Sequence, residues 1–353
     1  MNKYWSSIVK NIKPYTPGEQ PKDKKYIKLN TNENPYPPSP RVIAAIKEAA
    51  NEDLKLYPDP NCDALKAAIA QRYALTVEEI FTGNGSDEIL AFTFLAFFDP
   101  GKTIIFPDIS YSFYPVYANL FQVPYDPIPL REDFSLPIES FDKPNSGIVI
   151  ANPNAPTGKY LPIEYIRTIL EHNMNSAVIL DEAYIAFGGE SAIKLVSDFP
   201  NLLVIHTLSK SHSLAGLRVA YAVGNRGLIL ALERIKNSIN NYTLDRLAIT
   251  GAIEAIKDDD YFLATRAKII RTRERVYGEL LGMGFQCIES KANFLFISNP
   301  RIRADFLFKE LRQKGILVRY FNLPRIENHL RVTIGSDEEM DFFLTRIKEI
   351  ISD

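Results

Sequence analysis

Short apolar segments alternate with helix-like segments between residues 103 and 224, and this alternation restricts the fold more than any other feature of the sequence. The apolar segments are TIIF at 103–106, GIVIAN at 147–152, AVILDEAY at 177–184, LLVIHTL at 202–208 and VAYAVG at 219–224. Strands that are apolar throughout and are joined by helices pair in parallel, with helices on both faces of the sheet. The pattern therefore predicts a large α/β domain built on a mostly parallel sheet.

The segments on either side of this region follow other patterns. Residues 1–29 are rich in Pro, Lys and polar side chains, which predicts an irregular arm that packs with a small domain or with a partner chain. Residues 228–280 favour long helices, and the sequence after them alternates short strands with helices, as in an α+β domain. We expect a large domain over residues 30–245 and a small domain over residues 246–353.

Composition limits the partners and the compartment. The 353 residues include 46% hydrophobic and 24% charged residues, and the formal net charge of -2 argues against nucleic acid and anionic membranes as partners. No apolar run is long enough to span a bilayer, and the N-terminal sequence lacks the apolar core of a signal peptide. Cys62 and Cys287 lie far apart and the four histidines are scattered, so we expect a cytoplasmic protein without a metal site.

Lys210 follows the apolar segment LLVIHTL and Ser209, and Arg218 comes shortly after it. A lysine at the end of a buried strand can lose its charge and form a Schiff base with an aldehyde. Ser209 and Arg218 are suited to bind a phosphate near that lysine. An aldehyde that carries a phosphate describes pyridoxal 5′-phosphate (PLP), although a lysine judged alone is more often a surface residue.

The segment GNGSDE at 83–88 follows a strand-like run and opens an apolar helix. The backbone N–H groups of Ser86 and Asp87, together with the dipole of the helix, would form an anion site. A tight turn capped by Ser86 is an equally good interpretation. A dinucleotide site is less favoured, because Glu88 takes the last position of the G-x-G-x-x-G pattern.

Asp181 ends the apolar run VILD, at the edge where open α/β sheets bind their ligands. A carboxylate there keeps a pyridine nitrogen protonated, as PLP chemistry requires, and Tyr184 is placed to bind the ring hydroxyl. A helix-capping Asp is the simpler alternative. A nucleoside triphosphatase would need a G-x-x-x-x-G-K-[ST] loop, and the sequence has none.

Other candidate residues lie at two further strand ends and near the C-terminus. Tyr111 in SYSFY offers a face on which a flat ring can stack, and Asn154 in NPNAPTG offers a side-chain amide. Taken alone, Tyr111 is more often a core residue, and turn formation is the favoured explanation of Asn154. Arg319 and Arg331 lie in apolar strand-like runs, so each needs an anionic partner, either a carboxylate of the protein or a carboxylate or phosphate of a substrate.

The order of these motifs is more specific than any one of them. From LNTNENPYPPSP at 29–40 to LRVTIG at 330–335, the chain resembles the PLP-dependent aminotransferases of fold type I, and within them the histidinol-phosphate aminotransferases. The resemblance implies a large PLP-binding domain with a mostly parallel sheet and a smaller α+β domain. It also implies the transfer of an amino group from L-histidinol phosphate to 2-oxoglutarate in histidine biosynthesis.

The resemblance implies a role for each matching residue. Lys210 binds PLP covalently and acts as general base and acid, Asp181 pairs with the ring nitrogen and Tyr184 with the ring oxygen. The residues implied to bind the cofactor are Ser86, Asp87, Tyr111, Asn154, Asp181, Tyr184, Ser209, Lys210, Arg218 and, from the partner subunit of a homodimer, Tyr57. The residues implied to bind the substrate's anionic groups are Tyr15, Arg319 and Arg331.

One position departs from the family pattern. Ala155 stands directly before Pro-Thr-Gly, where the family often has an asparagine that contacts the ring oxygen. Either Asn154 makes this contact, or Tyr184 makes it alone. The alternatives are an aromatic amino-acid aminotransferase, a PLP-dependent decarboxylase of a phosphorylated amino acid on the same fold, and a non-catalytic PLP-fold module, which Lys210 argues against.

Overall fold

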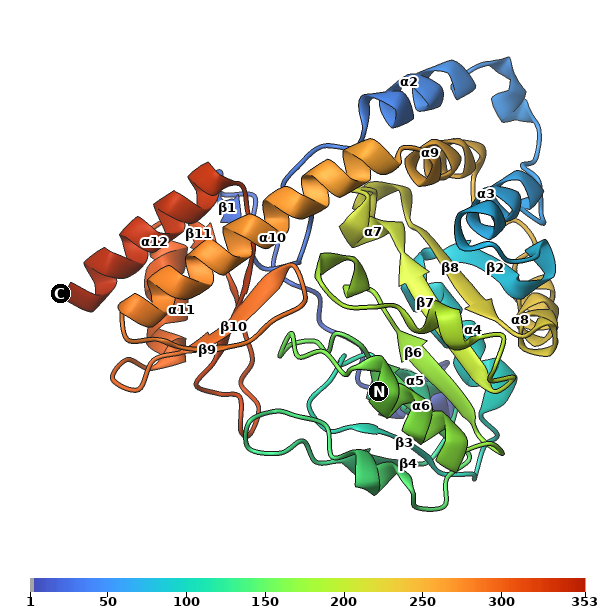
Figure 1. Ribbon diagram of the computed structural model, residues 1–353, viewed down its shortest axis with the longest axis horizontal. Coiled ribbons are helices and arrows are strands. Elements are labelled where there is room, and N and C mark those ends of the chain that lie inside the picture. The colour runs from blue at the N-terminus through green and yellow to red at the C-terminus, as the bar shows by residue number, and fades with distance from the viewer. Residues whose placement is uncertain (1–2, 353) are drawn as a thin grey trace.

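The computed structural model describes residues 3–352, which form a large domain around one sheet and a smaller domain beside it (Figure 1). The seven strands of the large sheet, within these residues, are β2 (Ile80–Asn84), β3 (Ile104–Pro107), β4 (Tyr125–Ile128), β5 (Gly147–Ala151), β6 (Ala177–Asp181), β7 (Leu202–Thr207) and β8 (Val219–Gly224). Their order in space is β2-β8-β7-β6-β5-β3-β4, and only β8 runs antiparallel to its neighbours. The expected mostly parallel sheet is confirmed.

The apolar runs form the central strands because both of their faces are buried. Ile148 and Leu180 point into one core cluster of the large domain, whereas Val149 and Ile179 point into the cluster on the opposite face. The strand β4 has no such run, since its sequence is YDPI and two of its residues are exposed. It lies at the edge of the sheet, where a proline is tolerated, and it was not expected from the sequence.

Helices cover both faces of this sheet. They are α2 (Pro40–Ala49), α3 (Asp63–Tyr73), α4 (Gly85–Phe97), α5 (Tyr114–Leu120), α6 (Ile163–His172), α7 (Leu208–Ser211), α8 (Arg226–Ile239) and α9 (Arg246–Lys257). Short 3-10 helices are found at Glu52–Lys55, Val77–Glu79, Ile138–Phe141, Ile185–Phe187, Ala192–Leu195 and Ala215–Leu217. Apolar side chains of α3, α6 and α9 enter one core cluster, and those of α4, α5 and α8 enter the other.

The small domain packs helices against a four-stranded antiparallel sheet with the order β12-β13-β10-β9, within the described residues. Its elements are α10 (Asp259–Gly282), β9 (Gln286–Ile288), β10 (Phe294–Ser298), α11 (Ala304–Gln313), β11 (Ile316–Leu317), β12 (Arg319–Tyr320), β13 (Leu330–Thr333) and α12 (Asp337–Ser352). The long helix α10 starts beside α9 and runs across to the small domain (Figure 1). An α+β architecture is therefore present, as expected.

The helix α9, which follows the predicted division at 245/246, packs with the large domain. Buried Ala252 and Ile256 of α9 belong to the core of the large domain, whereas Ile269 and Val276 of α10 belong to the core of the small domain. The chain changes direction at Asp258, whose side chain caps α10. Because α9 and α10 are separated by this single residue, their sequences resemble one continuous helical stretch. The packing of α9 favours a division near Asp258 over the predicted division at 245/246.

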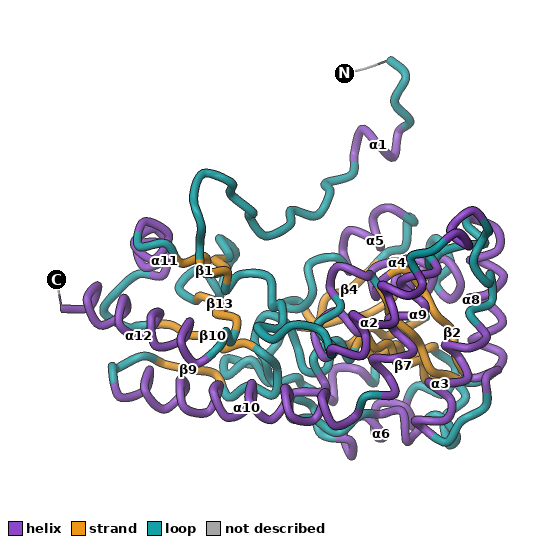
Figure 2. Tube along the Cα trace, turned by 90° about the horizontal axis from the view of Figure 1, so that it is seen from above, coloured by secondary structure: helices purple, strands orange, loops and turns teal. Residues whose placement is uncertain are grey.

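The N-terminal arm joins the small domain at β1 (Ile27–Lys28), which pairs in parallel with β11. Farther toward the N-terminus the arm carries the short helix α1 (Ser7–Asn11), which stands away from the body of the protein in Figure 2. The predicted arm and small domain also include residues 1, 2 and 353, which lie outside the described residues. No helix in the described part of the chain is long and apolar enough to cross a membrane.

Candidate active site

The carboxyl ends of the parallel strands meet at a cavity of about 460 Å³ that is also lined by the arm and the small domain. Because β8 is antiparallel to both β2 and β7, these two strands point the same way, and β2 delivers its following residues to this edge. Eleven predicted site residues line the cavity: Tyr15, Ser86, Asp87, Tyr111, Asp181, Tyr184, Ser209, Lys210, Arg218, Arg319 and Arg331. Tyr57 and Asn154 lie outside it.

One end of the cavity is suited to a phosphate. Ser86 and Asp87 lie in the first turn of α4, where backbone N–H groups have no partner within the helix. Arg218 lies beside them, with Nη2 3.2 Å from Asp87 Oδ2 and Nη1 3.5 Å from Ser209 Oγ. A Cβ atom on Gly85 would come within 2.4 Å of Arg218 Nη2, and φ is +80° at this glycine, so the close approach of the guanidinium requires glycine here.

Lys210 lies in α7, directly after β7, and its half-buried side chain lines the cavity. Its Nζ donates to the carbonyl oxygen of Thr31 at 2.8 Å. Burial lowers the pKa of Lys210 to about 8, and the nearby positive charge of Arg331 contributes in the same direction. The amine can therefore lose its proton near neutral pH, as a nucleophile or general base must.

Asp181 ends β6 and is only 5% exposed. Its Oδ2 accepts a hydrogen bond from the Tyr114 hydroxyl at 3.0 Å, and its Oδ1 accepts one from the backbone N–H of Ala183 at 3.3 Å. Burial raises the pKa of Asp181 to about 6, although the Tyr114 hydrogen bond acts in the opposite direction. A cationic ring nitrogen placed at this carboxylate would stabilise its charged form.

Aromatic side chains form one wall of the cavity. Tyr111 donates a hydrogen bond to Asp87 Oδ1 at 2.8 Å, which fixes the orientation of its ring. Tyr15 of the arm lies 6.2 Å from the ring of Tyr111 and stacks on Phe113 with 4.5 Å between ring centroids. The arm therefore closes the cavity on the side of Tyr111.

Arg319 and Arg331 are paired across strands β12 and β13 of the small domain. Arg331 donates from Nη2 to the Asn30 carbonyl at 2.9 Å, and its buried Nε has no hydrogen-bond partner among residues 3–352. Arg319 donates to the carbonyl oxygens of Thr16 and Pro17. Within these residues neither arginine forms an ion pair with an acidic side chain, so the protein supplies no carboxylate for them.

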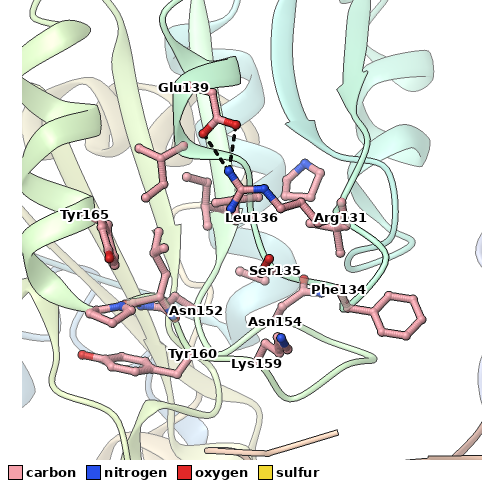
Figure 3. A pocket seen from close by; sticks show the side chains of 17 residues that line it. Arg131, Phe134, Ser135, Leu136, Glu139, Asn152, Asn154, Lys159, Tyr160 and Tyr165 are labelled. Atoms are coloured by element: carbon pink, nitrogen blue, oxygen red, sulfur yellow. Dashed lines mark hydrogen bonds and ion pairs between the residues drawn. The ribbon is translucent and has the colours of Figure 1, made fainter.

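Asn154 does not face this cavity, which corrects the role expected for it. Its Nδ2 donates to the Ile109 carbonyl at 2.9 Å and to Thr157 Oγ1 at 3.0 Å, and its Oδ1 accepts from Ser110 Oγ at 2.8 Å. All of these bonds stay within the turns at the strand ends. Figure 3 shows Asn154 lining a neighbouring cavity together with Lys159 and Phe134.

Tyr57 lies on the surface of the large domain, where the residue is 78% exposed. Its ring stacks on Tyr242 with 4.6 Å between centroids. The exposed Leu54 and Leu56 lie next to it in sequence. Tyr57 therefore contributes nothing to the cavity of its own chain.

Three residues near the reacting groups were not expected from the sequence. Tyr114 binds Asp181, Asn32 binds the Tyr184 hydroxyl, and Thr31 binds Lys210. Tyr114 belongs to the same aromatic segment as Tyr111, and nothing in the segment shows which tyrosine reaches the carboxylate. The other two come from the segment that follows the arm, whose contact with the strand ends depends on the tertiary fold. No cluster of His, Cys, Asp and Glu suited to a metal ion is present in the described residues.

Comparison with known proteins places this chain among enzymes. The family model for aminotransferases of class I and II matches residues 24–347. A histidinol-phosphate aminotransferase of Clostridium acetobutylicum is 60% identical over 352 residues, covering 100% of both chains, and one of Clostridium beijerinckii is 54% identical, covering 100% of this chain and 98% of its own. This chain has the same fold as a solved structure, that of the histidinol-phosphate aminotransferase of Sinorhizobium meliloti in complex with pyridoxal-5'-phosphate. The TM-score is 0.90 at 23% identity, and the match covers 100% of this chain and 98% of the other. The chain therefore belongs to the class I and II aminotransferase family, among the histidinol-phosphate aminotransferases.

Proposed function

We propose that this protein is a PLP-dependent aminotransferase that exchanges an amino group between L-histidinol phosphate and 2-oxoglutarate, giving imidazole-acetol phosphate and L-glutamate. The observation that carries the proposal is the meeting of Lys210, at the carboxyl end of the strands and with its pKa lowered to about 8, with two arginines that have no acidic partner in the described chain. An amine of this kind serves the chemistry, and the arginines serve anionic substrates.

The residues of the cavity fit PLP. The first turn of α4, Ser209 and Arg218 would hold its phosphate, Lys210 would hold it covalently through Nζ, and Asp181 would pair with its ring nitrogen. Tyr111 and Tyr184 would lie at its ring. When bound, PLP supplies an electron sink for the carbon that loses its proton.

The protein's own contribution to the reaction is a proton transfer in a site that is partly closed from water. Lys210 Nζ is the group placed to take the proton from the substrate's α-carbon and to return it, because it lines the cavity and its pKa is lowered to about 8. Asp181 stabilises positive charge at the ring nitrogen from a buried position. Tyr15 and Tyr111 restrict access of water on one side of the cavity.

Arg319, Arg331 and Tyr15 support an anionic amino donor. Two guanidinium groups that face one cavity repel each other unless an anion lies between them or beside them. A phosphate ester satisfies this need with up to three oxygens, and the carboxylates of glutamate satisfy it in the other half-reaction. Both substrates of the proposed reaction therefore have a reason to bind here.

The proposal includes a cytoplasmic homodimer in which Tyr57 of each subunit reaches the cofactor phosphate of the other. Its support is the surface position of Tyr57 beside the exposed Leu54 and Leu56, because apolar groups gathered in this way favour a protein interface. Cys62 and Cys287 are both free, as expected in a reducing compartment.

Steady-state kinetics test the substrate. With 2-oxoglutarate as acceptor, kcat/KM should be far higher for L-histidinol phosphate than for phenylalanine. Arg319→Ala should lower kcat/KM for histidinol phosphate by roughly 10- to 100-fold and leave that for phenylalanine within a few fold, because a charged hydrogen bond contributes about 1.5–3 kcal/mol. If phenylalanine is the better donor, the substrate is wrong, and CO2 release without a keto acceptor would indicate a decarboxylase instead. If Lys210→Ala retains full activity, the mechanism itself is wrong.

A further inference from the structure

Asn32 is a buried residue in an uncommon backbone conformation. Its exposure is 1%, and its φ of +56° lies in the left-handed region, which asparagine tolerates better than most residues. Its N–H donates to Thr333 Oγ1 at 3.0 Å, and its carbonyl accepts from Asn293 Nδ2 at 3.0 Å. The small domain therefore fixes Asn32 at the wall of the cavity, in a conformation that calls for a functional explanation.

The partners of Asn32 decide the direction of each hydrogen bond. Thr333 Oγ1 accepts the N–H of Asn32, so its own proton is free to donate to Asn32 Oδ1, which lies 2.9 Å away. Since Oδ1 is thereby used as an acceptor, Nδ2 faces the Tyr184 hydroxyl at 3.0 Å and donates to its oxygen. The bonds run in one direction, from Thr333 through Asn32 to Tyr184.

Tyr184 is left with a hydroxyl proton that it must donate elsewhere. Among the described residues, no protein acceptor takes this proton, because the hydrogen bond recorded for the hydroxyl is the one that it accepts from Asn32. Phe294 holds the ring in an edge-to-face contact with 5.0 Å between centroids, and Ala155 packs beside it. Ala155 offers only a methyl group, so it provides neither an acceptor for this proton nor a donor to a ligand.

We propose that Asn32, held by Thr333, is a positioning residue that keeps the Tyr184 hydroxyl a hydrogen-bond donor to the ring oxygen of the bound cofactor. A donor at that oxygen stabilises its anionic form, so the bound cofactor takes up a proton at lower pH than it would without the donor. The inference rests on the cofactor of the proposed function and not on its substrate. A titration of the holoenzyme without amino donor therefore tests it independently of the substrate.

The substitution Asn32→Asp tests the direction of the bonds. It keeps the size of the side chain and its tolerance of positive φ, but the Nδ2 donor becomes an oxygen that accepts the Tyr184 proton. The visible absorbance of the bound cofactor, followed against pH, should shift its midpoint upward by about one pH unit or more, as expected for the loss of a hydrogen bond to a charged group. An unchanged midpoint would overturn the proposal.

A double-mutant cycle separates this effect from the new negative charge at position 32. In a Tyr184→Phe background, Asn32→Asp should add little further shift, because the group through which it acts is gone. A shift of full size in that background would mean that the charge acts directly, and the positioning role would be refuted.

Two variants of Thr333 probe the other end of the chain of bonds and keep the proposal open to refutation if Asn32→Asp folds poorly. Thr333→Ser keeps the hydroxyl and should leave the midpoint unchanged. Thr333→Val keeps the shape but frees the Asn32 amide to turn, so the midpoint should rise by part of the shift seen for Asn32→Asp. Equal midpoints for the two variants would contradict the role of Thr333.

Discussion

Replacing Asp181 with asparagine should make the cofactor-free protein more stable at alkaline pH, although it removes a group that the cofactor needs. Asp181 is buried at the end of β6, and its contacts are hydrogen bonds from the Tyr114 hydroxyl and the Ala183 N–H. Burial raises its pKa to about 6 from an ordinary value of 3.8. The carboxylate is therefore held in its charged form against the preference of its surroundings.

The sign and size of the expected stability change follow from the raised pKa of Asp181. A raised pKa means that the folded protein binds the proton more tightly, so stability is fully present below pH 3.8 and is lost as the pH rises through about 6. About two pKa units correspond to about 3 kcal/mol at pH 8. Asparagine carries no charge and can donate from its amide to the Tyr114 oxygen, with a loss of about 1 kcal/mol in hydrogen bonding. The net gain for the variant is about 2 kcal/mol.

Thermal unfolding of the two apoproteins measures this gain. For 353 residues the entropy of unfolding is about 0.7 kcal/mol/K, so Asp181→Asn should raise Tm by about 3 °C near pH 8 and by clearly less near pH 5. The same variant should bind PLP at least about tenfold more weakly, because a neutral amide does not stabilise a protonated ring nitrogen.

Asp87→Asn is a matched control, since Asp87 lines the same cavity but has Arg218 3.2 Å away. Removing its charge should give no gain in Tm at alkaline pH. The reasoning is refuted if Asp181→Asn is no more stable than the wild-type apoprotein near pH 8. It is equally refuted if the gain is the same near pH 5, because a buried carboxylate predicts a gain that depends on its ionisation.

Charge and packing around the site lead to three more expectations. The rate of cofactor attachment, followed by stopped-flow absorbance, should increase as the pH rises through about 8. Arg331→Gln should raise the pH at which this rate is half-maximal, because the substitution removes a cation that lowers the pKa of Lys210. Arg325→Leu should accelerate hydrogen exchange in its loop, because its ion pair with Asp108 at 2.8 Å is lost, and unchanged exchange would contradict this. Ser39→Ala should lower the free energy of unfolding by about 1 kcal/mol through loss of the α2 cap, whereas Ser39→Thr should not.

The site residues that could be predicted from the sequence are those whose position is determined by a single strand and the residues that follow it. Asp181 and Lys210 each come directly after an apolar run, and parallel strands bring their carboxyl ends to one edge of the sheet. Ser86 was predictable for a similar reason, because it opens a helix after such a strand. In each case a local pattern fixes the position, and the sheet brings the residues together.

The parts that were missed depend on contacts between distant segments. Asn32 meets Thr333 across 301 positions, and Tyr114 meets Asp181 across 67, so no local pattern indicates either pair. The orientation of Asn154 was misjudged because Ser110 and Ile109, from a different strand end, bind its side chain and turn it away from the cavity. The composition of the NPNAPTG segment predicted a turn, but it did not predict the direction of the Asn154 side-chain amide.

The groups proposed for catalysis destabilise the folded protein when no cofactor is bound. Asp181 is buried and Lys210 is half-buried, and the loss of solvent moves the pKa of each toward neutrality. Arg331 lies where its positive charge further disfavours the charged form of Lys210. None of these side chains forms an ion pair within residues 3–352. A ligand with a negative centre near the cations and a positive centre near Asp181 would stabilise these charged groups together. Because such a ligand binds only the folded state, its binding would raise the free energy of unfolding. The unpaired charged groups at the carboxyl edge of the sheet thus lower the free energy of unfolding of the cofactor-free protein, and binding of the proposed cofactor would raise it again.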